Sequence, residues 1–273
     1  MIAVLIVIKI GGSILNAEEA SPELVSDLKN VLTKNAIVLV HGGGKEVTEI
    51  ASKLGKEQKF VVSPQGFRSR YTDKDTVEIY TMVMAGRLNK QIVRALQKQG
   101  IQTMGLSGLD GLLLRAERKK RITVVDERGR KRIVDGGYTG KICEVNANLL
   151  RVIMENGYVP IISPIAMSEE FEPLNVDADR TAAYVAGALH ADKLILLTDV
   201  QGLTLDGKLV SKLNASDVKE TLSKIGRGMI TKVYAATEAI NQGVGEVLIS
   251  SGLQRRTISS SLNHECGTVI SRE

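Results

Sequence analysis

The stretch Ile6–Ser13 reads Ile-Val-Ile-Lys-Ile-Gly-Gly-Ser, an apolar run that carries one lysine, Lys9, and stops at paired glycines. A lysine in an otherwise buried strand is costly unless a fixed anion compensates its charge. Two adjacent glycines let backbone N–H groups close around phosphate-like oxygens. This stretch therefore predicts a buried strand whose end handles an anion.

A second strand with a similar ending follows it. Residues 36–40 form a continuous apolar run that ends in His41-Gly42-Gly43-Gly44, and residues 17–33 between the two strands have helical spacing, with Ser21-Pro22 as a start signal. In a right-handed β-α-β unit both strand ends lie at the sheet edge where ligands bind. Neither turn fits the P-loop or the G-x-G-x-x-G pattern, which disfavours a P-loop NTPase and a Rossmann dehydrogenase. We interpret His41 as a residue that caps or packs the glycine turn.

Composition places the chain among ordinary globular proteins. Of its 273 residues 43% are hydrophobic and 25% charged, and with 3% aromatic residues and no Trp the core must consist of Val, Ile, Leu and Ala, which suits α/β layers. The apolar N-terminal run is too short to span a bilayer and lacks signal-peptide features, so we expect a cytoplasmic protein with no membrane partner. Cys143 and Cys266 stand apart, which argues against zinc, a redox pair or a disulfide framework.

The remaining pattern alternates helices and strands. We expect helices over 46–54, 76–98, 146–156, 180–189 and 233–241, strands over 101–106, 159–164, 193–198 and 246–250, and a final edge strand near 268–270. No linker rich in Pro, Gly or Ser interrupts the pattern. Any two lobes should therefore share one continuous sheet.

Positive charge is concentrated in one segment. Between Arg115 and Arg132 the sequence has nine Arg and Lys against three acids, so this basic arm carries a charge of +6. The whole chain has a net charge of +5, which leaves −1 on the rest. Residues 121–125 and 130–134 around a turn at 126–129 predict a β-hairpin. A charge run is often a solvated face, but a cationic arm on a nearly neutral body suits an acidic partner. Because no aromatics interleave with the cations, we do not expect nucleic acid.

Seven motifs in register resemble the amino acid kinase family, acetylglutamate kinase branch, over essentially the full chain. They are Lys-Ile-Gly-Gly-Ser at 9–13, His-Gly-Gly-Gly at 41–44, Arg-Tyr-Thr-Asp at 70–73, Gly-Leu-Ser-Gly at 105–108, Asn-Val-Asp-Ala-Asp at 175–179, Leu-Thr-Asp-Val-Gln-Gly at 197–202 and Gly-Met-Ile-Thr-Lys at 228–232. Residues 69–73, 135–141 and the basic hairpin look like the lysine and arginine pathway kinases that act on aminoadipate or glutamate attached to the small acidic carrier protein LysW.

The resemblance implies a fold and a reaction. It implies an open three-layer α-β-α sandwich with a mainly parallel sheet, as in carbamate kinase, with an acceptor-binding lobe over 1–173 and a nucleotide-binding lobe over 174–273. ATP with Mg²⁺ would phosphorylate the side-chain carboxylate of LysW-carried 2-aminoadipate or glutamate. Because the chain starts on the first strand and ends after the last, we expect no added regulatory segment and a simple homodimer. The alternatives are an N-acetylglutamate kinase and, in another class, a non-catalytic nucleotide or amino-acid sensor.

The resemblance also implies the site. Lys9 and Lys232 would stabilise the transition state, one from each lobe, with Asp179 between them to orient both. Other residues would bind the two substrates and the carrier. They are Gly43, Gly44, Arg70 and Asn175 for the acceptor, Gly11, Gly12, Ser13, Asp199, Gly202 and Gly228 for nucleotide and phosphate, and Arg118, Lys119, Lys120, Arg121, Arg130, Lys131 and Arg132 for carrier docking. Mg²⁺ prefers phosphate oxygens and water, so we expect no protein metal ligand.

Overall fold

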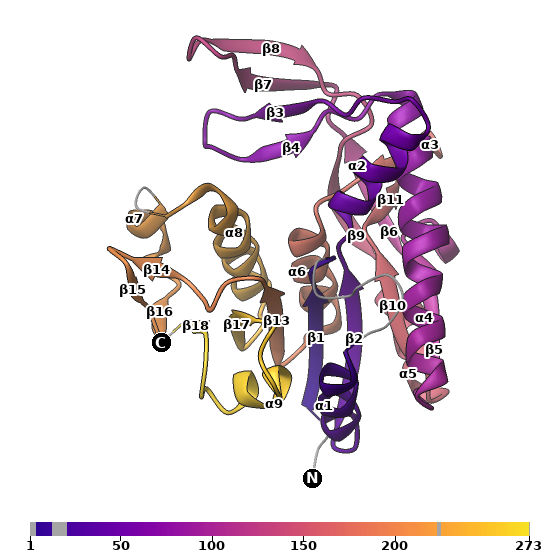
Figure 1. Ribbon diagram of the computed structural model, residues 1–273, viewed down its shortest axis with the longest axis vertical. Helices are drawn as coiled ribbons and strands as arrows, with labels where there is room; N and C mark the ends of the chain where they lie inside the picture. Colours follow the sequence, from indigo (N-terminus) through magenta and orange to yellow (C-terminus); the bar gives the residue numbers. More distant parts are fainter. Residues whose placement is uncertain (1–3, 13–20, 223–224, 273) are drawn as a thin grey trace.

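A computed structural model of the protein describes residues 4–12, 21–222 and 225–272. Its centre is an eight-stranded sheet in the order β16-β18-β17-β13-β1-β2-β10-β5, and only the β17–β18 pair is antiparallel (Figure 1). The strands are β1 (Val4–Ile10), β2 (Asn35–His41), β5 (Thr103–Ser107), β10 (Val159–Ser163), β13 (Lys193–Thr198), β16 (Lys212–Asn214), β17 (Glu246–Ser251) and β18 (Thr268–Ser271).

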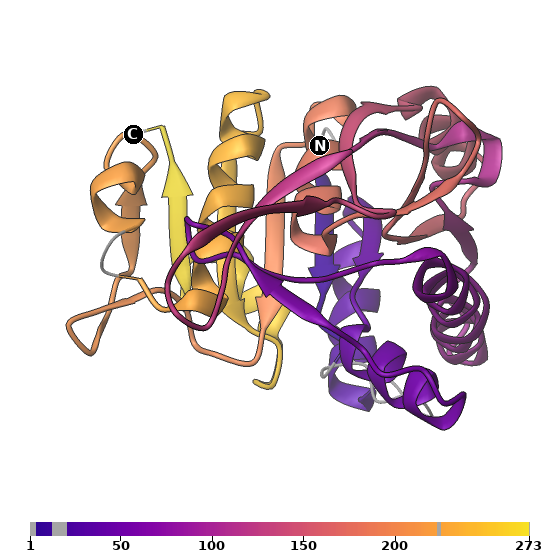
Figure 2. The same cartoon turned by 90° about the horizontal axis from the view of Figure 1, so that it is seen from above.

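Helices cover both faces of this sheet, which makes the three-layer sandwich (Figures 1 and 2). Alternate strand residues face opposite layers: Val7 packs with one set of helices, whereas Ile6 and Ile8 pack with the other. Because both faces are buried, the strands read as unbroken apolar runs. The first set is α5 (Ala147–Glu155), α6 (Ala178–Leu189) and α8 (Arg227–Asn241), and the second is α1 (Pro22–Leu32), α4 (Asn89–Lys98) and α9 (Thr257–Leu262).

Further elements lie beyond the carboxyl ends of the central strands. A four-stranded sheet has the order β12-β11-β6-β9, and two hairpins, β3–β4 and β7–β8, project past it (Figure 1). The bounds are β3 (Phe60–Val62), β4 (Arg68–Arg70), β6 (Leu114–Arg118), β7 (Arg121–Val125), β8 (Lys131–Asp135), β9 (Gly140–Val145), β11 (Ile165–Met167) and β12 (Pro173–Asn175). A small β14–β15 ribbon (Thr204–Leu205 and Lys208–Leu209) and the short helices Asp110–Leu112 and α7 (Val218–Thr221) complete the chain.

The helix starts follow from local chemistry. The Ser21 hydroxyl accepts from the N–H of Leu24 at 3.1 Å and Pro22 opens α1, as the sequence indicates, although residues 17–20 lie outside the described ranges. α2 (Gly44–Lys53) begins within the second glycine turn. The helix expected over 76–98 runs from α3 (Lys74–Thr81) into α4, but its middle, Met82–Leu88, is π-helical.

Three expectations from the sequence are wrong. β18 lies between β16 and β17 rather than at the edge, and the actual edge strand, β16, has only three residues and no apolar run that would reveal it. α8 begins at Arg227, so Lys232 lies in its second turn instead of before it. Only five of the nine cations of the basic arm lie in the β7–β8 hairpin, because Arg115 and Arg118 belong to β6 in the other sheet, and Lys119 and Lys120 connect β6 to β7.

None of the described helices combines the length and the apolar character that crossing a membrane requires.

Candidate active site

The two glycine turns touch each other at the carboxyl edge of β1 and β2. A Cβ placed on Gly12 would lie 2.8 Å from the Cα of Gly43, so this contact requires glycine. The N–H of Gly42 donates to the carbonyl oxygen of Ile10 at 2.9 Å, which joins the ends of the two strands. The predicted juxtaposition of the turns is present, whereas Ser13 lies outside the described residues.

One carboxylate bridges two lysines from different parts of the chain. Asp179, in the first turn of α6, lies 2.8 Å from Lys9 through Oδ1 and 3.1 Å from Lys232 through Oδ2. The three side chains are at most 14% exposed. We call Lys9, Asp179 and Lys232 the lysine clamp. Its geometry is the one expected from the sequence.

Charge within the lysine clamp is only partly balanced. Burial alone would lower the pKa of Lys9 and raise that of Asp179, but their mutual attraction raises the pKa of Lys9 overall and, together with the attraction of Lys232, lowers the pKa of Asp179. Lys9 and Asp179 are therefore both charged at neutral pH. Two ammonium groups around one carboxylate leave an excess positive charge that suits a polyphosphate.

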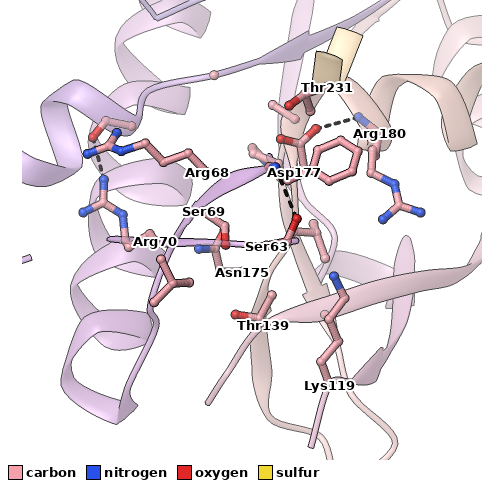
Figure 3. Close-up of a pocket in the computed structure, with 18 of the residues that line it drawn as sticks. Ser63, Arg68, Ser69, Arg70, Lys119, Thr139, Asn175, Asp177, Arg180 and Thr231 are labelled. Carbon is pink, nitrogen blue, oxygen red and sulfur yellow. Dashed lines mark hydrogen bonds between the residues drawn. The ribbon is translucent and has the colours of Figure 1, made fainter. Parts of the chain in front are cut away.

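A cavity of about 720 Å³ opens beside the lysine clamp (Figure 3). Six of the predicted site residues besides Lys9 line it, together with parts of both hairpins and of α8. They are Gly12, Gly43, Gly44, Arg70, Lys119 and Asn175. Phe67 of the β3–β4 turn contacts Tyr234 of α8 edge to face, with ring centroids 5.5 Å apart. The cavity is therefore bounded by segments from both predicted lobes.

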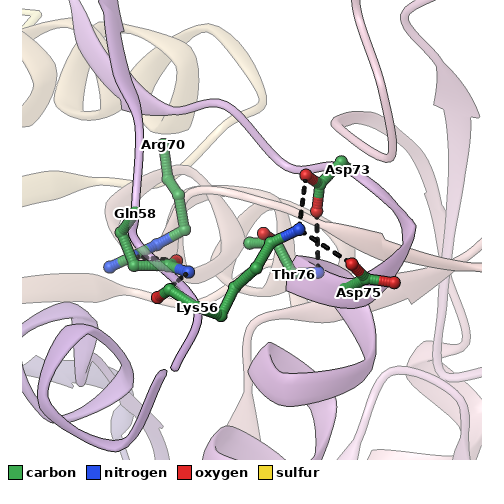
Figure 4. A network of polar contacts seen from close by, with 6 residues as sticks. All are labelled: Lys56, Gln58, Arg70, Asp73, Asp75 and Thr76. Atoms are coloured by element: carbon green, nitrogen blue, oxygen red, sulfur yellow. Dashed lines mark hydrogen bonds and ion pairs between the residues drawn. The ribbon is translucent and has the colours of Figure 1, made fainter. Parts of the chain in front are cut away.

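Arg70 is 7% exposed and braced by neutral acceptors (Figure 4). Nη1 donates to Gln58 at 2.5 Å, and Nη2 donates to the Gly44 carbonyl at 2.7 Å and to Thr48 at 3.0 Å. Within the described ranges no carboxylate pairs with this guanidinium. Three of its five donors are engaged, so two are free for a ligand oxygen.

The base of the β3–β4 hairpin is held by a second polar group (Figure 4). Lys56 bridges Asp73 and Asp75 at 2.8 Å each, and Asp73 also caps α3 by accepting from the N–H of Thr76. This bridge fixes the segment that presents Gln58 to Arg70. No pattern in the sequence indicated Gln58, Thr48 or Lys56 as supports of the predicted arginine.

Asn175 ends β12 and faces the cavity (Figure 3). Its Nδ2 donates to Thr72 Oγ1 at 3.0 Å, and Thr72 is fully buried and donates in turn to the carbonyl oxygen of Arg70. Two predicted acceptor residues, Arg70 and Asn175, are thus linked through one threonine. Thr72 belongs to the Arg-Tyr-Thr-Asp motif, which is the signal that could have identified it.

Lys119 departs from the expected docking surface. It projects toward the cavity near Arg180, and burial and then that neighbouring charge lower the pKa of Lys119 (Figure 3). Arg118 is also anchored, donating to the Gly137 carbonyl and pairing with Glu172 at 2.8 Å.

The rest of the predicted docking set lies at the surface. All five are exposed, namely Lys120, Arg121, Arg130, Lys131 and Arg132, and two of them, Arg130 and Arg132, also pair with Asp126. Of the seven predicted docking residues only Arg118 and Lys119 are therefore partly buried.

Apart from Gly12, the described nucleotide residues of the prediction do not line this cavity. Asp199 is exposed directly after β13 and accepts from Thr198 Oγ1 at 3.1 Å. Gly228 lies exposed in the first turn of α8, with open space where a side chain would be. Gly202 is packed against Leu209 and Thr268, so its role is in the fold at this point. Gly11 directly follows β1 and precedes Gly12, but it does not line the cavity.

In the parts of the chain that the structure describes, no group of three or more His, Cys, Asp or Glu could hold a metal ion.

Comparison with known proteins identifies the family. The model of the amino acid kinase family matches residues 4–251. The chain belongs to the amino acid kinase family. This membership makes the protein a phosphotransferase that uses ATP. A curated relative from Saccharolobus solfataricus, the LysW-aminoadipate/LysW-glutamate kinase, is 44% identical over 97% of this chain and 99% of its own. A protein of Nitrosopumilus maritimus that bears a provisional form of the same name is 52% identical over 98% of this chain and 100% of its own.

Solved structures share the same architecture. A protein of Streptococcus mutans has a TM-score of 0.79 and 28% identity, covering 98% of this chain and 99% of its own. Carbamate kinase from Giardia lamblia has a TM-score of 0.68 at 16% identity over 100% of both chains, a level that speaks for the fold alone. The fold expected from the sequence is confirmed.

Proposed function

We propose that this amino acid kinase transfers the γ-phosphoryl group of ATP to the side-chain carboxylate of 2-aminoadipate or glutamate carried by LysW, giving an acyl phosphate. The lysine clamp beside a cavity that holds Arg70 and Asn175 is the observation that carries the proposal. The names of the relatives at 44% and 52% identity support the carrier-bound acceptor.

The reaction needs positive charge more than it needs a base. The acceptor carboxylate is already ionised, so no side chain has to remove a proton. Attacker and phosphoryl group are both anionic, and Lys9 and Lys232 reduce their repulsion as the new bond forms. Asp179 holds both ammonium groups in place before the substrates arrive, which removes the cost of arranging them during the reaction.

We assign ATP to the lobe over 174–273 and the acceptor to the lobe over 1–173. Asp199 and Gly228 are the nucleotide residues whose surroundings leave room for a ligand. The excess positive charge of the lysine clamp fits the phosphates. Mg²⁺, held by phosphate oxygens and water, would neutralise part of the phosphate charge.

The acceptor would lie between the glycine turn and the hairpins. The N–H groups of Gly43 and Gly44 and the two free donors of Arg70 would bind the oxygens of the amino acid. Asn175 would contact the amide that joins it to the carrier. Because Lys119 lines the cavity, we assign it to the linked acceptor rather than to the outer docking face.

The outer face of the β7–β8 hairpin is the proposed docking surface for the carrier. Arg121 and Lys131 are exposed there, and Ile133 between them in space is 70% exposed. Cations around an apolar side chain suit an acidic protein partner. A homodimer and a cytoplasmic location stay predictions from the sequence.

Initial rates of ADP release test the acceptor. Wild-type protein should show a higher kcat/KM on LysW-linked aminoadipate or glutamate than on free N-acetylglutamate. Replacing Arg130, Lys131 and Arg132 by Gln should raise only the KM for the carrier-linked acceptor. Robust turnover of N-acetylglutamate with none on the linked acceptors would identify an N-acetylglutamate kinase instead, and ATP binding without any turnover would identify a sensor.

A further inference from the structure

The second glycine turn is supported from behind by two buried side chains. His41, the last residue of β2, is 1% exposed, and its Nδ1 lies 3.1 Å from the carbonyl oxygen of Gly42. Its Nε2 lies 3.3 Å from Nδ2 of Asn89, the first residue of α4, which is 0% exposed. Neither residue lines the cavity or belongs to the lysine clamp. They are polar, buried and outside the proposed mechanism.

The hydrogen bonds fix the state of the His41 ring. A carbonyl oxygen only accepts, so Nδ1 must carry the proton that bonds Gly42, and Nε2 of the neutral ring then accepts from Asn89. Burial is the main cause that lowers the pKa of His41 to about 4, with a smaller contribution from Lys90, although the bond to Gly42 opposes it. At neutral pH the ring is therefore uncharged, in the tautomer that donates to Gly42.

Asn89 can take only one orientation. Its Nδ2 also lies 2.9 Å from the carbonyl oxygen of Ile161 and 3.4 Å from that of Leu106, and its Oδ1 accepts from Lys90 at 3.1 Å. A flipped amide would direct oxygen at two carbonyls and nitrogen at an ammonium group. The orientation of the Asn89 amide toward His41 is therefore fixed by three other partners, while its two N–H protons are shared among three acceptors.

The π-helical segment ends directly before Asn89 and packs on the same turn. A Cβ on Gly43 would lie 2.9 Å from Met84 Sδ and would overlap Leu88, so this segment closes one side of Gly43. π-Helical turns occur frequently at functional sites. Here the segment supplies both the apolar wall of the turn and, through Asn89, its polar support.

We propose that Asn89 is a positioning residue that acts through His41 to aim the N–H of Gly43 at the acceptor. A trans peptide is planar, so the carbonyl of Gly42 and the N–H of Gly43 point in opposite directions. With the carbonyl bonded to His41, the N–H points away from it, and Gly43 lines the cavity. No described backbone carbonyl accepts from this N–H. That the acceptor is what Gly43 binds rests on the proposed function.

Steady-state kinetics of Asn89→Leu, His41→Asn and His41→Gln test the proposal. Asn89→Leu should raise the KM for the acceptor about tenfold, the worth of one aligned hydrogen bond, with the KM for ATP and kcat unchanged. His41→Asn keeps a donor near the place of Nδ1, whereas His41→Gln does not, so the glutamine variant should show the higher acceptor KM. Asn156→Leu, at the exposed end of α5 where Asn156 bonds Val152, is the matched control and should leave all three constants unchanged.

A double variant separates positioning from loss of structure. Adding Asn89→Leu to His41→Asn should not raise the acceptor KM further, because Asn89 acts through the Nε2 that this background lacks. Additive effects on KM, or a fall in thermal stability and kcat with an unchanged acceptor KM, would overturn the proposal. All variants are assayed with whichever acceptor the wild type turns over, so failure of the carrier-bound assignment is seen separately in the wild type.

Discussion

Replacing Asp179 by Asn tests the lysine clamp because it removes the charge and keeps the shape. In the wild type the carboxylate lies 2.8 Å from Lys9 and 3.1 Å from Lys232, and its side chain is 6% exposed. Removing one partner of a buried ion pair typically costs about 3–5 kcal/mol. Because the lysine side chains are 10% and 14% exposed, water relieves part of the repulsion, and we expect about 3 kcal/mol. For a chain of this size that lowers the melting temperature by roughly 6–12 °C.

The pH dependence of the Asp179→Asn variant has a definite sign. The lowered pKa of Asp179 stabilises the wild type above about pH 4, the unfolded value, and this contribution disappears as the pH falls through the folded pKa. The stability gap between the two proteins should thus be full at neutral pH and shrink in acid. For Lys9 the raised pKa depends on Asp179, so in the variant burial dominates and the alkaline loss of kcat should move to lower pH.

Thermal unfolding followed by circular dichroism and kcat measured across pH check both effects. The expected result is a large loss of kcat at pH 7 together with the fall in melting temperature. A variant that kept the wild-type melting temperature and kcat would show that Asp179 does not organise the two lysines. If kcat of the variant were lost at the same alkaline pH as that of the wild type, only the proposed effect of Asp179 on the pKa of Lys9 would be refuted.

Four further substitutions give separate outcomes. Lys9→Met should lower kcat by roughly 10²–10³-fold with little change in acceptor KM, because it removes charge stabilisation of the transition state; ADP release measures both. Arg70→Lys keeps the charge but loses the planar fork, so acceptor KM should rise about tenfold, and an unchanged KM would remove Arg70 from the site. Lys131→Gln should raise KM for the carrier-linked acceptor and flatten its salt dependence without affecting a free acceptor. Asp27→Ala should lower the free energy of unfolding by roughly 1–3 kcal/mol, measured in urea, with kcat unchanged, because the buried Asp27 carboxylate accepts from the N–H groups of Ile258 and Ser259.

The central sheet could be predicted because its strands have a recognisable sequence pattern. β1, β2 and β13 are buried on both faces, so their sequences are continuous apolar runs that end at glycine or polar turns. The clamp residue Asp179 could be placed because an acid at a helix start is favoured and the motif around it resembles a known family. Apolar runs in the sequence therefore predicted the central strands, and the family motif predicted the position of Asp179.

Other features depend on tertiary contacts that no local pattern carries. β16 is three residues long and exists through its pairing with β18. A charge count treats Lys119 and Lys120 alike, although the chain turns one toward the cavity and leaves the other exposed. The π-helical segment has the same helical spacing as its neighbours, so periodicity predicts one continuous helix there.

The side chains that hold the predicted site residues in place are equally hard to predict from the sequence. Gln58 and Thr48 contact Arg70 across distances of twelve and 22 residues in the chain. Asn89 reaches His41 across 48 residues. Such partners become visible only once the fold brings them together, which is why the sequence indicated candidate binding residues but not the side chains that hold them.

Hydroxylamine trapping of the product tests the central claim most directly. Wild-type protein, ATP and LysW-linked aminoadipate or glutamate should form a hydroxamate on the carrier, because an acyl phosphate reacts with hydroxylamine. The Lys9→Met variant should form almost none under the same conditions. ADP release from the wild type without any hydroxamate on the linked acceptors, or equal trapping by the Lys9→Met variant, would contradict phosphorylation of a carboxylate by the lysine clamp.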